Sequence, residues 1–144
     1  MKLLVLGATG GTGMEIVRQA LQRGHFVTAF VRSPERLNLF AGRISAKQGN
    51  VLNPTELAQV VEGHDAVLSG FGPRLPVSKA DANLLRQFGD ALTSALAQAA
   101  VRRVIVESVA FLFKDSIIPA AYFLGRLLFP VVVADGATIP GKRT

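Results

Sequence analysis

The sequence predicts an α/β fold in which helices cover both faces of a doubly wound parallel sheet of at least five strands. Short apolar runs alternate with stretches of helical periodicity along most of residues 2–106, the pattern of strand–helix–strand units. A glycine-rich turn at residues 7–13 joins the first run to the first helical stretch. The chain has 144 residues, 49% hydrophobic and 18% charged, so it can bury one core.

The first strand–helix–strand unit follows from periodicity. Residues 2–6 form a continuous apolar run that Gly7 stops, which is typical of a central parallel strand buried on both faces. From Gly13 the pattern is helical until Gly24 ends it, and residues 25–31 form the second strand. The apolar side chains of this helix recur at spacings of three and four, as Met14, Val17 and Leu21.

A third, weaker strand is expected at residues 44–49, and the link that precedes it shows no clear helix. The next helix opens with Asn53 as its cap, Pro54 at its first position and Glu56 placed to close a capping box. Gly63 ends this helix. Its inner face is Leu57, Val60 and Val61.

The last two strands flank a long helix. Residues 65–69 form the fourth strand, residues 70–77 hold the glycines and prolines of a loop, residues 80–100 form the helix and residues 103–106 the fifth strand. The inward side of the helix is expected to be Leu84, Leu85, Phe88, Leu92 and Leu96.

The glycine-rich turn predicts a dinucleotide site. Gly7 permits the tight turn off the strand, Gly10 lets a pyrophosphate approach the backbone, and Gly13 lets the helix pack against the strand. The first helical amides then face the phosphates, and the hydroxyls of Thr9 and Thr12 can add hydrogen bonds. A turn without a ligand is the alternative, but the strand–turn–helix context is the one that the motif requires.

The end of the second strand predicts NADP rather than NAD. An acid at this position would bind the ribose 2′-hydroxyl and repel a 2′-phosphate, but the sequence has Arg32 and Ser33, with Arg36 nearby. A guanidinium is always charged and can donate two parallel hydrogen bonds to phosphate oxygens. An ordinary surface arginine is the alternative interpretation.

Two further strand ends should line the same groove, because ligands of open α/β sheets bind beyond the carboxyl ends of the strands. Asn50 and Val51 follow the third strand, where the adenine would lie. Ser69, Gly70 and Phe71 follow the fourth strand, on the path toward the nicotinamide, and Phe71 is equally compatible with the core.

Four segments together resemble the atypical short-chain dehydrogenases/reductases, most closely their NmrA-like and flavin reductase (biliverdin reductase B)-like branch. They are Gly7-Ala8-Thr9-Gly10-x-x-Gly13, Val31-Arg32-Ser33-Pro34, Gly49-Asn50-Val51 and Val101-Arg102-Arg103-Val104-Ile105-Val106-Glu107-Ser108. The resemblance covers residues 1–133 and implies a Rossmann-like fold that binds NAD(P)H. Members often carry Asp in place of Asn50; Asn keeps the acceptor and adds a donor.

The resemblance and the strand ends together predict NADP as the cofactor, with NADPH preferred over NADH. The expected cofactor-binding residues are Gly7, Thr9, Gly10, Gly11, Thr12, Gly13, Arg32, Ser33, Asn50, Val51, Ser69, Gly70 and Phe71.

The end of the chain departs from the family. Members continue into further strands and a C-terminal substrate-binding part, whereas residues 135–144 no longer resemble them. We therefore expect an NAD(P)-binding domain at residues 1–133, an atypical tail at residues 134–144, and a truncated or frame-shifted product.

The catalytic residues are the second point at which the chain departs from the family. Many short-chain dehydrogenases use a serine and a Tyr-x-x-x-Lys motif, in which the tyrosine donates a proton and the lysine lowers its pKa. Tyr122 is the single tyrosine, and Arg126 stands at the lysine position, so an amphipathic residue in an apolar segment is the simpler interpretation. The reductase-like branch does not rely on that tyrosine, and Ser108 is the candidate for orienting a substrate, with capping as its alternative.

The expected reaction is hydride transfer to a small carbonyl, quinone, flavin or tetrapyrrole. The alternatives are a non-catalytic NADP-binding regulator and an inactive fragment. In a fragment, the apolar segment at residues 117–133 would lack a covering element and drive self-association.

The composition of the chain limits the ligands, partners and location that we expect for it. The chain has no cysteine, which excludes a thiolate metal site and fits a reducing cytoplasm. Its net charge of +6 is spread along the chain, so nucleic-acid binding is not expected. Prolines and Arg126 interrupt the apolar stretch at residues 116–134, which argues against a membrane span. His25 and His64 precede the second and fourth strands and are expected to be structural, and no metal cluster is expected.

Overall fold

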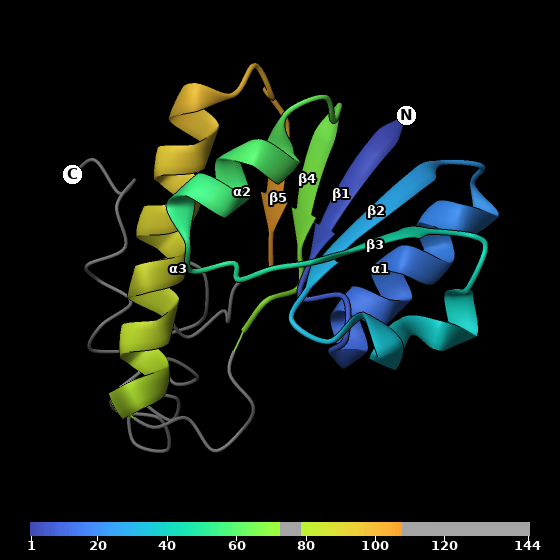
Figure 1. Cartoon of the computed structure of the whole chain (residues 1–144), viewed down its shortest axis with the longest axis horizontal. Helices are drawn as coiled ribbons and strands as arrows, with labels where there is room; N and C mark the ends of the chain where they lie inside the picture. Colours follow the sequence, from blue (N-terminus) through green and yellow to red (C-terminus); the bar gives the residue numbers. More distant parts are fainter. Residues whose placement is uncertain (73–78, 108–144) are drawn as a thin grey trace, which may run out of the picture. The chain divides into compact units, whose positions relative to one another are not determined.

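A parallel sheet with the strand order β3-β2-β1-β4-β5 organises the chain, as the sequence predicted. The computed structural model describes residues 1–72 and 79–107, apart from the side chains of Lys79 and Ala82. The elements follow the expected order to within one or two residues at each end (Figure 1). The strands are β1 (Lys2–Leu6), β2 (Phe26–Val31), β3 (Ser45–Gln48), β4 (Ala66–Ser69) and β5 (Val104–Val106), and the helices are α1 (Gly11–Gln22), the 3-10 helix η1 (Pro34–Phe40), α2 (Pro54–Val61) and α3 (Lys79–Gln98).

The described residues belong to two compact units. The first unit, Met1–Phe71 with Asp90–Glu107, contains the whole sheet, α1, η1, α2 and the C-terminal half of α3. The second unit includes Gly72–Gly89. Every described residue of the sites argued below lies within the first unit.

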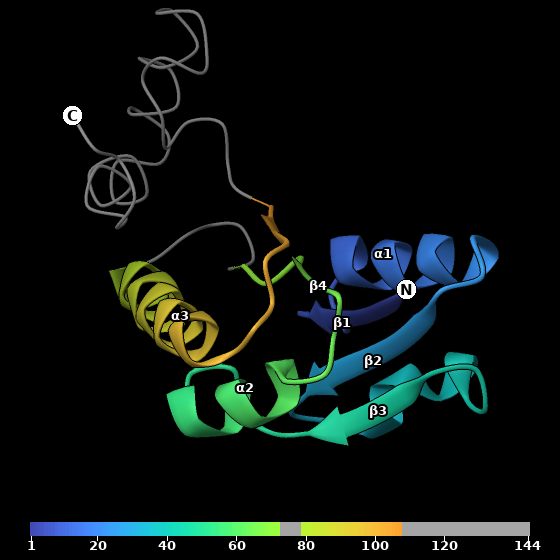
Figure 2. The same ribbon diagram turned by 90° about the horizontal axis from the view of Figure 1, so that it is seen from above.

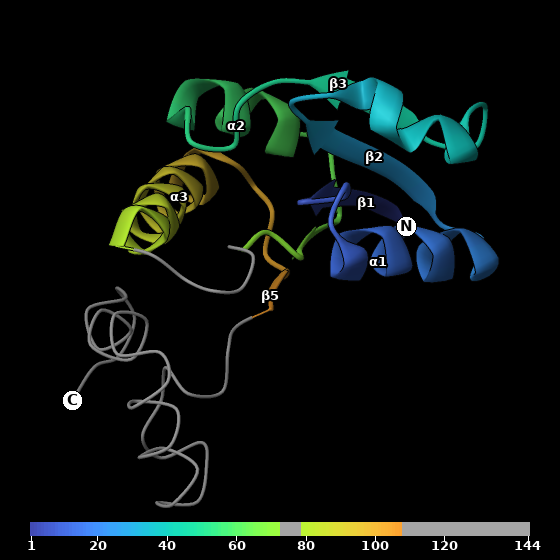
Figure 3. The ribbon, with the colours of Figure 1, turned by 90° about the horizontal axis from the view of Figure 1, so that it is seen from below.

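The central strand β1 is buried on both faces, which confirms the prediction from its apolar run. Leu3 and Val5 join Val17 of α1 in one hydrophobic cluster. Leu4 and Leu6 alternate with them and are 0% exposed. Figures 2 and 3 show α1 and α2 on opposite sides of the sheet, so the two sets of side chains face different helices.

The link between β2 and β3 contains the helix η1, which the sequence pattern did not reveal. Leu37 and Phe40 are 2% and 4% exposed and belong to the cluster that also contains Val17. The element bends at Leu37, whose φ of −105° and ψ of 15° are not helical, so η1 consists of two short helices joined at a kink. With seven residues, η1 is too short to produce a recognisable helical period, yet it helps to cover the same face of the sheet as α1.

In α3 the expected inner face is buried only in part. Phe88 and Leu92 are buried, whereas Leu84, Leu85 and Leu96 are partly exposed. Two small residues that apolar spacing did not single out are also buried: Ala91 and Ala95. Within the described ranges, none of the helices has both the length and the apolar character to cross a membrane.

The two edges of the sheet differ in chemistry. All four residues of β3 are exposed, and they include Lys47. At the other edge, Ile105 and Val106 are 65% and 46% exposed. In the part of the chain that the structure describes, β5 pairs with β4 alone.

Replacing Gly13 with alanine is expected to destabilise the protein. The new Cβ would collide with the carbonyl oxygen of Gly7 and lie 2.7 Å from the Cα of Ala8, so α1 must move away from β1. Overpacking of this kind costs about 1–3 kcal/mol. Gly11→Ala is the matched control, because a Cβ there meets nothing within 4 Å. Urea unfolding measures both variants, and equal losses of stability would contradict this packing.

Candidate functional site

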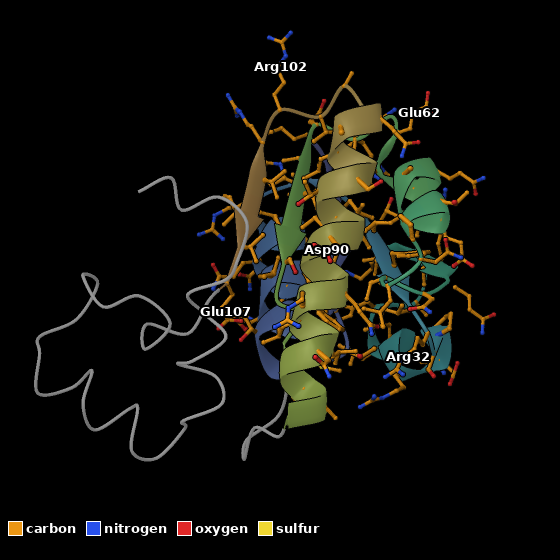
Figure 4. All side chains as sticks on the ribbon, turned by 90° about the vertical axis from the view of Figure 1, so that its left-hand side faces the viewer. Arg32, Glu62, Asp90, Arg102 and Glu107 are labelled. Carbon is orange, nitrogen blue, oxygen red and sulfur yellow. The ribbon has the colours of Figure 1, made fainter. Side chains whose placement is uncertain are left out.

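The carboxyl ends of the strands form the candidate site. In Figure 4, Arg32 after β2 and Glu107 after β5 lie toward one end of the sheet, and Glu62 and Arg102 toward the other. The chain crosses from one side of β1 to the other between β3 and β4, so the order of strands reverses at β1. In an open α/β sheet, this reversal opens a crevice beyond the strand ends.

Residues 7–13 form the turn that leads from β1 into α1. Gly7 has a φ of 69°, a left-handed conformation that glycine adopts without a Cβ penalty. The amide of Gly10 donates to the carbonyl of Gly7 at 3.1 Å, and the amide of Met14 donates to the carbonyl of Gly10 at 2.9 Å. Backbone hydrogen bonds therefore set the shape of this turn.

A second loop locks the turn against the end of β4. A Cβ on Gly7 would lie 2.5 Å from the amide nitrogen of Phe71, and a Cβ on Gly70 would lie 2.9 Å from the amide nitrogen of Gly13. The amide of Gly70 also donates to the carbonyl of Leu6 at 3.0 Å. The protein's own packing therefore requires Gly7, Gly13 and Gly70.

Gly10 has no such internal reason to be glycine. A Cβ there would approach only the Gly7 carbonyl oxygen, at an ordinary 3.5 Å. Its φ of −83° is open to any residue. The space beside Gly10 is therefore a cradle that a side chain would fill, as expected where a pyrophosphate approaches the backbone.

The N-terminus of α1 offers unused donors to the same space. Gly10 supplies no side-chain cap, and the first turn contains no acidic residue. The amides of residues 11–13 meet no acceptor among the described residues. One turn further on, hydrogen bonds from Arg18 and then Gln19 hold the Glu15 carboxylate and lower its pKa to about 2. Free amides at the positive end of a helix dipole suit an anion such as a diphosphate.

Polar groups from β4 and β5 lie beside this turn. The Thr12 hydroxyl donates to Oε1 of Glu107 at 3.3 Å, and the Glu107 amide donates to the Ser69 carbonyl at 2.9 Å. Ser69 is 1% exposed, and its hydroxyl accepts from the Phe71 amide at 3.2 Å. Ser69 is thus buried, and its hydroxyl shapes the Gly70–Phe71 turn.

Sequence reasoning missed Glu107, although it touches a predicted binding residue. Its place directly after β5 is the signal that could have found it, because the same rule identified the residues after β4.

Arg32 and Ser33 lie where β2 leads into η1. The Gln48 side chain donates to the Arg32 carbonyl at 3.1 Å and so fixes the backbone at this point. The Arg32 side chain is exposed and makes no ion pair with any residue that the structure describes. Ser33 is half-buried, and its carbonyl accepts from the amide of Arg36 at 3.2 Å. The end of β2 therefore presents an unpaired cation.

Asn50 and Val51 follow β3. The side-chain oxygen of Asn50 accepts from the Leu52 amide at 3.0 Å, and the Asn50 amide donates to Oε2 of Glu56 at 2.8 Å. Val51 is 8% exposed. Because the Asn50 oxygen already has a partner, its side-chain NH₂ is the group best placed to contact a ligand.

The capping box expected at α2 is wrong in one detail. Asn53 caps the helix as predicted, with its side chain accepting from the amides of Thr55 and Glu56 at 3.0 and 3.3 Å. Glu56 does not return to the Asn53 backbone amide, which donates to the Asn50 carbonyl instead. The Glu56 carboxylate binds the Asn50 amide and the Asn53 side chain, so it stabilises the loop rather than the cap.

Some of the remaining predicted residues lie in the described part of the chain, and others lie outside it. Thr9 lies half-buried in the glycine turn, and His25 and His64 lie at the opposite end of the strands, as expected. Ser108 and Tyr122, the candidate catalytic residues, fall outside the described residues, as do residues 117–133 and 134–144. Over the described ranges, no group of three or more His, Asp or Glu side chains could hold a metal ion.

Comparison with known proteins gives a family match. The model of a family described as NAD(P)H-binding matches residues 7–129. Over 106 residues the chain is 32% identical to the uncharacterized protein YwnB of Bacillus subtilis, covering 74% of this chain and 46% of YwnB. Over 77 residues it is 38% identical to the photosystem II assembly factor Ycf39 of Synechocystis, covering 51% of this chain and 23% of Ycf39. The matched segments therefore span less than half of either relative.

Solved structures share the fold. The oxidoreductase YlbE of Lactococcus lactis aligns with a TM-score of 0.73 at 21% identity, over 94% of this chain and 61% of YlbE. ChuY of Escherichia coli O157:H7, described as an anaerobillin reductase, aligns with a TM-score of 0.68 at 15% identity, over 95% of this chain and 66% of ChuY. At such identities these likenesses support the architecture alone.

Gly10→Ala separates folding from binding. Because the new Cβ meets only an ordinary contact, we expect the free energy of unfolding to change by less than about 1 kcal/mol. The methyl group would fill the cradle, so affinity for a nicotinamide dinucleotide should fall at least about tenfold, which is about 1.4 kcal/mol. Fluorescence titration with NADPH, beside urea unfolding, tests both parts. Unchanged affinity would show that no ligand approaches this backbone.

Proposed function

This chain belongs to the NAD(P)H-binding family, and on that premise we propose that it is an oxidoreductase of the atypical short-chain dehydrogenase/reductase type. It uses NADPH to reduce a small carbonyl, quinone, flavin or tetrapyrrole. The observation that carries the proposal is the glycine turn, where three amides at the start of α1 have no acceptor among the described residues and a Cβ at Gly10 would meet only one ordinary contact. We further propose that it acts in the cytoplasm.

Different groups of the chain would bind different parts of the cofactor. The amides of residues 11–13 would hold the diphosphate, and the side-chain NH₂ of Asn50 would contact the adenine. The turn at Gly70 and Phe71, fixed from below by Ser69, would form the floor toward the nicotinamide. When bound, the reduced cofactor supplies the hydride, and the protein binds and orients both reactants.

NADP is proposed over NAD because of the charge at the end of β2. Arg32 is exposed, is anchored through its carbonyl and has no ion-pair partner in the described part of the chain. No acid stands among Val31, Arg32 and Ser33 to bind a ribose 2′-hydroxyl. A guanidinium can instead donate two parallel hydrogen bonds to the 2′-phosphate that distinguishes NADP from NAD.

Arg32→Ala is expected to weaken NADPH binding by at least about tenfold while changing NADH binding by less than about twofold. Calorimetric titration with both cofactors measures the difference. Arg102→Ala is the matched control, because it removes an exposed arginine at the opposite end of the strands. Equal losses for the two cofactors, or equal effects of the two variants, would refute the NADP assignment.

The substrate is a proposal drawn from the sequence. Ser108 directly follows Glu107 and is proposed to hydrogen-bond the reducible group, and Tyr122 is the second candidate proton donor. Because the chain spans less than half of its sequence relatives, the activity of the whole protein remains part of this proposal.

A non-catalytic NADP-binding regulator is the second candidate. The observation that favours it is the sequence Tyr122-x-x-x-Arg126, which lacks the lysine of the usual catalytic motif. An arginine could lower the tyrosine pKa but lacks the compact ammonium of lysine. An inactive fragment that self-associates through residues 117–133 is the remaining alternative.

Turnover distinguishes these candidates. Mixing the protein with NADPH and a panel of small carbonyls, quinones, flavins and tetrapyrroles should cause NADPH to be oxidised with at least one acceptor. Ser108→Ala should lower kcat for that acceptor by at least about tenfold with little change in NADPH affinity. Tight NADPH binding without oxidation of any acceptor would favour the regulator.

A further inference from the structure

An open surface pocket, called the cavity below, lies at the amino ends of the strands, the opposite end of the sheet from the glycine turn. Its volume is about 460 Å³. The side chains that matter are Lys2 at the start of β1, Phe26 and Thr28 of β2, Arg43 before β3, and the two histidines of the chain. All of these residues belong to the first unit.

The charged groups on its wall are positive. Lys2 and Arg43 are both exposed, and neither forms an ion pair within the portion of the chain that is described. Asp65 is the acidic neighbour, and its carboxylate accepts from the backbone amide of Lys2 at 2.6 Å. That carboxylate is not part of the cavity lining, and the two cations exceed its charge.

One of the two histidines that line the cavity is held in place by a hydrogen bond. Nε2 of His64 lies 2.9 Å from the hydroxyl of Thr28, which fixes the ring on the wall. Nδ1 of the same ring is buried and has no partner among the described residues. Because Nδ1 is buried, the ring lines the cavity with its other atoms and is held there through the Thr28 hydroxyl.

An aromatic ring completes the lining. Phe26 is 74% exposed, the largest exposure among the large hydrophobic residues described. Its backbone is nevertheless fixed, because its amide donates to the Met1 carbonyl at 3.0 Å and β-sheet pairing sets it opposite Lys2. A rigid backbone therefore holds an exposed ring beside a cation, a combination that suits a ligand with an apolar part and a negative charge.

We propose that this cavity binds a small organic anion, in which a phosphate or carboxylate is attached to an aromatic or similarly flat apolar group. Lys2 and Arg43 neutralise the anion, Phe26 packs against the apolar group, and the two histidines line the same cavity. The site is separate from the glycine turn and does not depend on the proposed reductase activity.

The two histidines make the proposal directly measurable. Phenyl phosphate is titrated into the full chain while long-range ¹H–¹⁵N spectra record both imidazole rings. We expect both rings to shift along one saturable curve. Benzoate tests the carboxylate form, inorganic phosphate supplies the charge without the ring, and benzyl alcohol supplies the ring without the charge. The last two should bind at least about threefold more weakly than phenyl phosphate.

Variants assign the effect to the cavity. Lys2→Ala and Arg43→Ala should each weaken phenyl phosphate binding by about two- to fivefold, the range of exposed ion pairs. Phe26→Ala should reduce phenyl phosphate to the affinity of inorganic phosphate, and Arg102→Ala should change nothing. Saturating NADPH should also leave the curve unchanged. Shifts that do not saturate, or that are equal for all four probes and variants, would overturn the proposal.

Discussion

The contact between the backbones of Gly7 and Gly13 is the constraint on which the rest of the structure depends. No side chain fits between them, so α1 packs directly on the turn that leaves β1. Gly70 meets the same backbone from the end of β4. This packing of three glycines brings the start of α1 and the ends of two neighbouring strands to one point. The first amides of α1 lie at this point and have no acceptor among the described residues.

The two proposed sites at the ends of the sheet would bind negative charge by different means. At the carboxyl end the donors are backbone amides, whose positions are fixed by the helix, and a single exposed guanidinium stands at the end of β2. At the amino end the cations are the side chains of Lys2 and Arg43, which carry rotamer freedom. The first arrangement favours a ligand of one shape, whereas the second tolerates several.

Sequence reasoning succeeded where one local rule governs a residue. The apolar run of β1, the cap at Asn53 and the glycine turn each follow from the chemistry of a few neighbouring residues. It failed where partners come from distant segments. The contact of Thr12 with Glu107 and the burial of Ser69 depend on how strands assemble. The helix η1 was missed because seven residues give no period to detect.

The two edges of the sheet differ in how readily they would accept another strand. Lys47 and its polar neighbours in β3 would place charge and hydration in the path of any incoming strand. β5 instead offers Ile105 and Val106 on a strand whose outer hydrogen-bonding groups have no strand partner among the described residues. Of the two edges that the structure describes, an incoming strand would therefore meet less charge at β5 than at β3.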